Sequence, residues 1–338
     1  MGQDNTPVLA ADIGGTSARF ALFGQDDILA PIGPGALVVL RTADYSSFQE
    51  LVDAALGRLG HPKIRAAVLA VAGPVERGRF CRPPNIAYCF DLDRLARGIL
   101  PDRALLVNDF IAQAHGCRLL GKLFSNHNVP SVQEAAFSSP KEHILTVFPG
   151  RMDPTLTQAV VGPGTGLGKA ALAPDGRGGF VICASEGGHA AFAFNGSPEE
   201  NDLQRFVLET LGEPYVRVES MISGAGLALL HRSLTGQPAS PADAEAALTP
   251  DSPVTAWFAR FLGRICRDYV LDVLATGGLF LSGGVAARNP MLLAHEAFQE
   301  EFCLSATHAE LLAKVPVRLV TDQLIGLRGA AALASGLP

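Results

Sequence analysis

The stretch VLAADIGGTSARFALF, residues 8–23, decides the fold. Two apolar segments, Val8–Ile13 and 18–23, flank a short turn that runs from Gly14 to Ser17. Apolar segments on both sides of a glycine turn predict a β-hairpin. Gly14 and Gly15 can adopt the positive φ that such a turn needs.

The same pattern returns in residues 159–172, where two valines enter a turn from Gly162 to Gly168 and a second apolar segment leaves it. This internal repeat predicts two halves of related layout. Uninterrupted apolar runs at 66–72 and 104–107 are typical of strands that are buried on both faces of a sheet. Residues 48–59 have helical apolar spacing behind a possible capping box, so the fold class is α/β.

The remaining elements follow from the same patterns of hydrophobicity. Further strands are expected at 36–41, 180–184 and 279–282, helices at 202–211 and 256–275 and from Phe110, and variable loops at 123–154 and 237–253.

The composition excludes several classes of protein. A chain of 338 residues, 48% hydrophobic, is long enough for two domains or one large bilobed one. A net charge of −6 provides no basic surface, so no nucleic-acid partner is expected. Its six cysteines form no CxxC pair, which argues against a zinc knuckle or a dithiol site. Neither a signal peptide nor a membrane span is evident, so a cytoplasmic protein without a membrane partner is expected.

The first glycine turn has the composition of a phosphate site. Asp12 ends a strand, and Gly14, Gly15, Thr16 and Ser17 follow it. Backbone N–H groups in such a turn can bind an anion, and the adjacent carboxylate of Asp12 can hold Mg²⁺ through water. Alone, this motif would more often be an ordinary glycine hairpin.

The second glycine turn strengthens the phosphate hypothesis. It differs from a Walker loop, because Pro163 and Ala170 occupy positions that require Gly and Ser or Thr, and it does not match the dinucleotide fingerprint. Two such hairpins, one in each half, can bind a triphosphate from both sides. The residues expected to approach the phosphates here are Gly162, Gly164, Thr165 and Gly166.

A third glycine pair, Gly283 and Gly284, follows the strand at 279–282, and small residues there would admit an adenine ring. Taken alone, this pair is better explained as a simple strand-to-helix turn. Residues 224–226, Gly-Ala-Gly, are a weaker candidate for contact with a nucleotide.

Several polar residues stand where strands end, which is where sites of α/β proteins gather. Asn108 and Asp109 follow the strand at 104–107, and Asp109 could be either a helix N-cap or a functional acid. Glu186 and His189 follow another strand. Glu219 lies beyond the next predicted helix, and Asn85 lies in the Pro-rich loop 82–87. Each of these polar residues could be merely a solvated loop residue, which is their usual state.

Taken together, these motifs resemble the bacterial glucokinase family, within the wider group of hexokinases, sugar kinases and actin-like ATPases. Five motifs occur in order along nearly the whole chain, and the ordered set is specific although no single motif is. They are DIGGTSAR at 12–19, VND at 107–109, GPGTGLG at 162–168, SEGGH at 185–189 and LSGGV at 281–285.

The resemblance implies two ribonuclease-H-like domains with mixed sheets around a central cleft. The expected small domain comprises residues 1–110 with 322–338, and the large one residues 111–321. It further implies transfer of the γ-phosphoryl group of ATP, with Mg²⁺, to the 6-hydroxyl of glucose, a step of glycolysis, by a homodimer. By analogy, Asp109 is the base, and the sugar-binding set is Asn85, Asn108, Asp109, Glu186, His189 and Glu219.

Two alternatives remain open at this point: a kinase of another hexose, and a non-catalytic sugar or nucleotide sensor on the same fold. Residues 190–194, AAFAF, depart from the family's usual VDFAP, and Pro84 replaces an expected Thr, which bears on sugar selectivity. Related kinases and repressors add a CxCGxxGC zinc motif, which this sequence lacks, so zinc is not expected.

Overall fold

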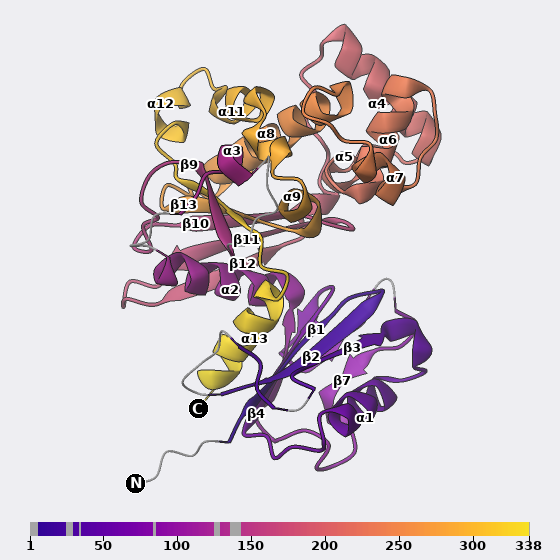
Figure 1. The fold of residues 1–338 in the computed structure, drawn as a ribbon, viewed down its shortest axis with the longest axis vertical. Coiled ribbons are helices and arrows are strands. Elements are labelled where there is room, and N and C mark those ends of the chain that lie inside the picture. The colour runs from indigo at the N-terminus through magenta and orange to yellow at the C-terminus, as the bar shows by residue number, and fades with distance from the viewer. Residues whose placement is uncertain are drawn as a thin grey trace. The chain divides into compact units, whose positions relative to one another are not determined.

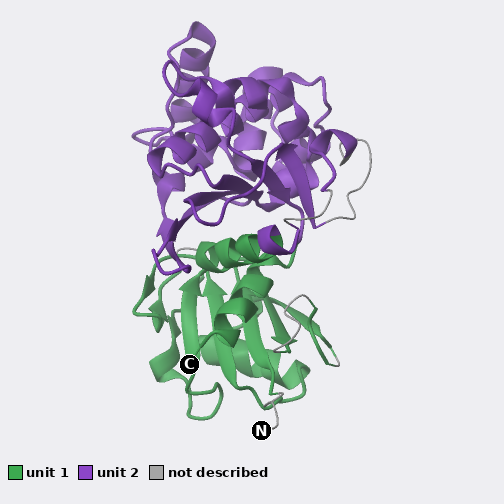
Figure 2. Cartoon of the chain, turned by 90° about the vertical axis from the view of Figure 1, so that its left-hand side faces the viewer, with its two compact units in different colours: residues 1–120, 323–338 green, residues 121–322 purple. Residues whose placement is uncertain are grey.

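The computed structural model describes residues 6–24, 30–33, 35–83, 86–124, 129–135 and 143–337. The chain divides into two compact units, residues 1–120 with 323–338 and residues 121–322 (Figure 2). The first unit extends about ten residues beyond the expected boundary at 110, because it keeps most of the helix Asp109–Leu123.

The first unit is built on a five-stranded sheet with the order β3-β2-β1-β4-β8 (Figure 1). Strands β1, β2 and β3 form an antiparallel meander, and β4 and β8 then extend the sheet parallel to β1. The strands are β1 Val8–Ile13, β2 Ser17–Phe23, β3 Leu37–Arg41, β4 Ala66–Val71 and β8 Ala104–Asn108.

Strand β1 is apolar at every position except Asp12 because the sheet is buried on both faces. Leu9, Ala11 and Ile13 belong to one core, whereas Val8 and Ala10 belong to the core on the opposite face. Helix α1, Phe48–Arg58, covers the first face and helix α13, Ile325–Ser335, lies on the other side (Figure 1). The continuous apolar runs are therefore strands buried on both faces of a sheet, as the sequence predicted.

The first unit also contains a short three-stranded ribbon of β5 Val75–Glu76, β6 Phe80–Cys81 and β7 Phe90–Asp91, helix α2 Asp109–Leu123, and 3₁₀ turns at Thr42–Asp44 and Leu92–Arg94. The predicted cap of α1 is confirmed in part: Ser47 Oγ accepts the N–H of Glu50 at 3.2 Å, whereas the Glu50 carboxylate accepts the N–H of Ser46, the residue before the N-cap, at 2.9 Å.

Helices α2 and α13 cross at glycines. A Cβ at Gly329 would lie 1.7 Å from the carbonyl oxygen of Ala112, and one at Gly116 would lie 2.3 Å from that of Ile325. Only glycine lets the two backbones approach this closely, so these residues fix how the C-terminal helix joins the first unit.

The second unit repeats the plan of the first. Its six-stranded sheet has the order β12-β11-β10-β13-β14-β9, in which an antiparallel meander is again followed by two parallel strands. Only β9, antiparallel at the edge, has no counterpart. The strands are β9 Ile144–Phe148, β10 Gln158–Pro163, β11 Leu167–Pro174, β12 Phe180–Ser185, β13 Gly278–Ser282 and β14 Val317–Val320. The internal repeat is confirmed.

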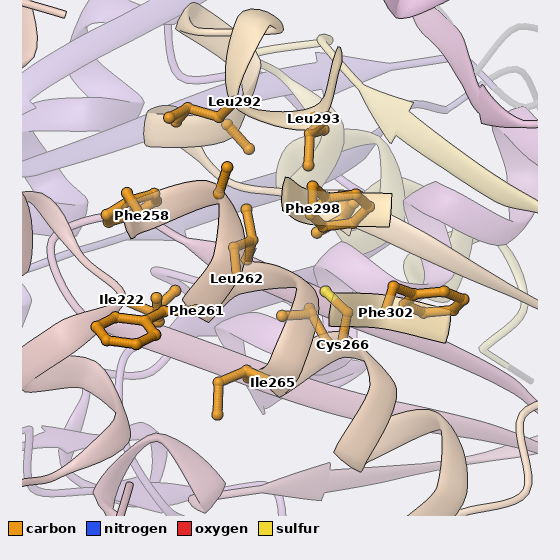
Figure 3. Packing of buried hydrophobic residues seen from close by; sticks show 14 of the residues in the cluster. Ile222, Phe258, Phe261, Leu262, Ile265, Cys266, Leu292, Leu293, Phe298 and Phe302 are labelled. Carbon is orange, nitrogen blue, oxygen red and sulfur yellow. The ribbon is translucent and has the colours of Figure 1, made fainter. Parts of the chain in front are cut away.

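Helix α8, Pro253–Asp272, provides the centre of the core in this unit (Figure 3). Its side chains Phe258, Phe261 and Leu262 are fully buried and belong to one cluster with Phe298 and Phe302 of α11. The other helical segments are α3 Val132–Ala135, α4 Pro198–Leu211, α5 Val218–Met221, α6 Gly224–Thr235, α7 Pro241–Ala246, α9 Gly284–Arg288, α10 Met291–Ala294, α11 Glu296–Cys303, α12 Ala309–Leu312 and a 3₁₀ turn at Gly187–His189. Among the helices of the described residues, none has the length and hydrophobicity that a membrane span requires.

Three expectations need correction. The proposed loop at 123–154 contains the buried strand β9, and the one at 237–253 contains α7, which Ser240 caps by accepting the N–H of Asp243 at 3.2 Å. Both elements are short, which is why periodicity missed them. Neither Gly14 nor Gly15 has positive φ.

A buried ion-pair network crosses the second unit. The Arg264 guanidinium of α8 donates to both carboxylate oxygens of Glu200 on α4, at 2.7 and 2.8 Å, and to Glu301 on α11 at 2.7 Å. It also donates to the carbonyl of Ala193 at 2.9 Å, while Glu200 accepts the N–H of Asn195 at 2.7 Å. The network therefore ties two helices and the loop at 190–197 to the central helix.

We expect Arg264→Met to lower the free energy of unfolding by about 3 kcal/mol, because it leaves the buried Glu200 carboxylate without its cation and leaves Glu301 with only its longer pair to Arg267. Urea unfolding followed by fluorescence of Trp257, the only tryptophan and a residue of α8, would measure this. Arg205→Met removes an ion pair whose partners are both about two-thirds exposed. That control should change stability by less than about 0.5 kcal/mol. Equal stability of the two variants would contradict the role of the network.

Candidate active site

The β1–β2 turn is held by the backbone and by a residue that the sequence did not indicate. The Gly14 N–H donates to the Ser17 carbonyl at 2.9 Å. Thr42, which is buried, donates its hydroxyl to the Gly14 carbonyl at 2.9 Å and its N–H to the Thr16 carbonyl at 3.2 Å. The turn is thus rigid although Gly15 and Thr16 are exposed.

Asp12 is the second-last residue of β1 and lies near this turn. Its Oδ2 lies 3.8 Å from Nη1 of Arg19, its register partner on β2, and helix α13 approaches at Gly326, where a Cβ would lie 3.2 Å from the same oxygen. Burial raises the pKa of the Asp12 carboxyl, while Arg19 opposes that shift. A nearby dication would stabilise the charged form.

The donor set around Asp12 fits a hydrated metal ion. Across the described ranges, no three acidic, histidine or cysteine side chains converge so that they could hold a metal directly. Magnesium commonly keeps several waters and uses one or two carboxylates together with substrate phosphates. A single carboxylate beside a phosphate-type turn is the donor set that such an ion needs.

Asn108 and Asp109 stand at the junction of β8 and α2. The Asn108 amide donates to the Gly73 carbonyl at 3.1 Å, and its Oδ1 accepts the N–H of Phe110 at 2.9 Å. Asn108 therefore performs the helix-capping function that was the alternative explanation for Asp109. Asp109 is the first residue of α2, is half-buried, and also accepts the Phe110 N–H at 2.9 Å.

Asp109 shares its surroundings with Cys81 of the small ribbon. Burial, reinforced by the Asp109 carboxylate, raises the pKa of the Cys81 thiol to about 11. This thiol is therefore neutral at physiological pH. Asn85, also proposed for sugar binding, lies outside the described residues.

The β10–β11 turn in the second unit parallels the first. Gly162 pairs with Gly168 and Pro163 with Leu167, so the turn consists of Gly164, Thr165 and Gly166. The Gly164 N–H donates to the Gly166 carbonyl at 2.8 Å, and the Gly164 carbonyl accepts the N–H of Gly224 at 2.9 Å. Residues 224–226 therefore contact this turn at the start of α6, where the N-cap residue Ser223 accepts the N–H of Gly226 through its hydroxyl.

Glu186, His189 and Glu219 meet in one cluster. Nε2 of His189 lies 3.7 Å from Oε2 of Glu186, and Nδ1 lies 3.4 Å from Oε1 of Glu219. Glu186 and His189 have more than half of their side chains exposed, whereas Glu219 has only 20%. Two carboxylates and an imidazole that converge at a partly open surface can bind several hydroxyl groups.

A short backbone ladder sets this cluster. The Val218 N–H donates to the Ala190 carbonyl at 2.9 Å and the Phe192 N–H to the Val216 carbonyl at 2.8 Å, so the segments after His189 and before Glu219 run antiparallel. The Tyr215 hydroxyl adds a bond to the His189 carbonyl at 3.1 Å. Long-range pairing therefore brings together residues that are 30 positions apart.

Glu219 also lies beside the glycine turn. A Cβ at Gly166 would be 2.7 Å from Oε2 of Glu219. The glycine thus leaves room for the carboxylate, so Glu219 connects the cluster of Glu186 and His189 to the turn within the second unit.

The third glycine pair has a structural function of its own. A Cβ at Gly283 would lie 2.4 Å from the Pro163 carbonyl, so this residue lets β10 and the start of α9 approach. A Cβ at Gly284 would instead meet the Arg288 side chain at 2.7 Å. Their contact with adenine remains a prediction.

The departure at 190–194 has a packing explanation. Phe192 is buried in the core and its ring lies 4.8 Å from both Phe194 and Phe261. These rings, together with the bond from Arg264 to the Ala193 carbonyl, anchor the segment that follows His189.

Comparison with known proteins connects these features to one family. The family model described as glucokinase matches residues 9–337. The curated glucokinase of Marinobacter nauticus is 33% identical over 335 residues, which cover 96% of this chain and 95% of that protein.

Solved structures agree with this result. A glucokinase from an Antarctic psychrotroph has a TM-score of 0.73 at 28% identity, covering 98% of this chain and 99% of its own. A Balamuthia mandrillaris glucokinase, solved with glucose, has a TM-score of 0.77 at 20% identity, covering 98% and 94%, and shares the fold. Because the family model spans residues 9–337 and a curated glucokinase is 33% identical over 96% of the chain, this chain belongs to the glucokinase family.

Proposed function

We propose that this chain transfers the γ-phosphoryl group of ATP to the 6-hydroxyl of glucose and releases glucose 6-phosphate. The observation that carries the proposal is the position of Glu219, which lies next to His189 on one side and next to Gly166 on the other. A group that accepts bonds from hydroxyls lies directly beside a phosphate-type turn. A sugar kinase requires that arrangement, because acceptor and donor must be held in line.

In this proposal the second unit supplies three sugar ligands, Glu186, His189 and Glu219. Carboxylates only accept hydrogen bonds, and sugar hydroxyls donate them, so each pairing is favourable. A sugar that lacks one hydroxyl, or presents it differently, would leave a desolvated carboxylate unpaired at a cost of about 1–3 kcal/mol. Asn108, and by the resemblance Asn85, complete the set.

Asp109 is the proposed base. Asp109 is the first residue of α2, directly after the strand end at Asn108, and Asn108 provides the helix cap that was the alternative role of this carboxylate. Asp109 would accept the proton of the 6-hydroxyl while the oxygen of that hydroxyl attacks the γ-phosphorus. The bond from the γ-phosphorus to the β–γ bridging oxygen then breaks, and ADP leaves.

The turns at 14–17 and 162–166 would bind the phosphates through backbone N–H groups. Gly283 and Gly284 would lie near the adenine. Asp12 would hold hydrated Mg²⁺ through water. When bound, that ion neutralises charge on the phosphates.

The proposal also includes a cytoplasmic location, a contribution to glycolysis and a homodimer, all of which rest on the family resemblance. Light scattering coupled to size-exclusion chromatography would test the dimer.

A coupled assay with MgATP and glucose, mannose, fructose and N-acetylglucosamine tests the main proposal. Glucose should give the highest kcat/KM, and 6-deoxyglucose should bind without turnover because it has no acceptor hydroxyl. A higher kcat/KM for another hexose would favour the first alternative. Glucose binding by calorimetry with no turnover of any sugar would favour a sensor.

The role of Asp109 makes a separate prediction. Asp109→Asn keeps the shape and removes the basicity, so kcat should fall at least about 100-fold while the Kd for glucose stays within about threefold. Thermal stability should change little, since Asn108 caps the helix. Asp102→Asn, at an exposed position a few residues earlier, is the matched control. Turnover near the wild-type level would remove Asp109 from the mechanism.

The two glycines of the β10–β11 turn should respond differently. A Cβ at Gly164 meets nothing within 4 Å, so Gly164→Ala should fold normally and raise the KM for ATP by about tenfold through obstruction of the anion. Gly166→Ala must displace Glu219, so the KM for glucose should rise as well. Gly24→Ala also enters open space and serves as control. Unchanged ATP kinetics in a folded Gly164 variant would contradict phosphate binding by this turn.

A further inference from the structure

We propose that Arg217 is a positioning residue for sugar recognition, which holds the Glu219 carboxylate in the orientation that receives a sugar hydroxyl. The inference rests on the proposed function and deepens it. Neither the glycine turns nor the SEGGH motif indicates this arginine, which lies two residues before Glu219 and between two acids.

Arg217 forms hydrogen bonds with both Glu213 and Glu219. Its Nε and Nη2 donate to the two oxygens of Glu213, at 3.0 and 2.6 Å. Its Nη1 donates to Oε1 of Glu219 and lies 3.5 Å from Nδ1 of His189. One guanidinium therefore touches one acid on each side and the imidazole of the sugar cluster.

Contacts other than the one with Glu219 hold the Arg217 guanidinium in place. Its bidentate pairing with Glu213 sets the plane of the fork, and the bridge between Ala191 and Arg217 sets the backbone. Arg217 and Glu213 have about 30% of their side chains exposed, so the pair is only partly screened by solvent. A planar fork with several donors can hold two carboxylates in defined directions, which a lysine ammonium cannot do.

The two carboxylate oxygens of Glu219 consequently have different neighbours. Oε1 faces Arg217 and His189, whereas Oε2 lies next to the Gly166 turn. A carboxylate whose one oxygen is fixed in this way cannot rotate freely, so its remaining lone pairs point in one direction. Such pre-organisation lowers the entropy lost when a sugar binds.

Charge balance supports the same assignment. Glu186, Glu213 and Glu219 lie around His189 and Arg217, and Lys169 is buried under Gly187, where its Nζ would lie 3.6 Å from an added Cβ. Of Arg217 and Lys169, Arg217 is the cation that contacts both Glu219 and Glu213. Without it, two neighbouring carboxylates would lose their shared partner and move apart.

Steady-state kinetics of Arg217→Met test the proposal. We expect the KM for glucose to rise by about tenfold, because the sugar then binds a Glu219 carboxylate that is no longer held in one orientation, while the KM for ATP changes less than about twofold. Arg217→Lys should recover part of the loss, since the charge returns without the fork. Glu213→Gln should give a smaller increase, because it loosens the arginine without removing it. Arg205→Met, an exposed arginine of α4, is the control.

A double-mutant cycle separates positioning from general destabilisation. If Arg217 acts through Glu219, then Arg217→Met should add little to the glucose KM of Glu219→Gln. Additive effects of the two substitutions, equal increases in the KM for glucose and for ATP, or an unchanged glucose KM in Arg217→Met would each overturn the inference. Glu213→Gln keeps the test valid if the methionine variant does not fold. Failure of the proposed function itself would appear separately, as absence of glucose phosphorylation by the wild-type protein.

Discussion

The parallel pairing of β1 with β4 and of β4 with β8 is the constraint on which the first unit depends. Because parallel strands end at the same edge of a sheet, this pairing places Asp12 and the residues after Val71 and Val107 at one edge. The pairing requires strands that are apolar on both faces, and the polar residues occur only where the strands end. The strand pairing of the backbone thus brings the polar residues of this unit to one edge of the sheet.

The second unit has a sheet of the same strand arrangement, but its polar cluster is assembled differently. Glu186 and His189 follow an antiparallel strand, and Glu219 arrives on a separate short helix that a two-bond ladder fixes. The Arg264 network then holds the segment between them. Rigid backbone elements therefore surround side chains that are themselves partly exposed, which suits a site that must admit and release a polar ligand.

Much of the fold followed from the sequence because its decisive patterns are local. The hairpin at 8–23, its repeat at 159–172 and helix α1 are each specified by neighbouring residues. Thr42 could not be found in this way, because its partner Gly14 lies 28 positions away along the chain. Arg217 is close in sequence to both Glu213 and Glu219, but no local pattern indicates that one guanidinium joins these two acids and the imidazole of His189. Gly283 makes room for the backbone of Pro163, a contact that no sequence pattern reports, and its expected contact with a ligand stays a prediction.

Helix α13 gives the chain a particular order of assembly. It covers one face of the first sheet and crosses α2 through Gly329, yet it comes from residues 325–335, after the entire second unit. During synthesis the ribosome therefore delivers every strand of the first sheet long before the helix that completes its core. The second unit is contiguous from residue 121 to 322 and can fold while the first still exposes an apolar face. The half of the molecule that is made first is consequently the half that is finished last.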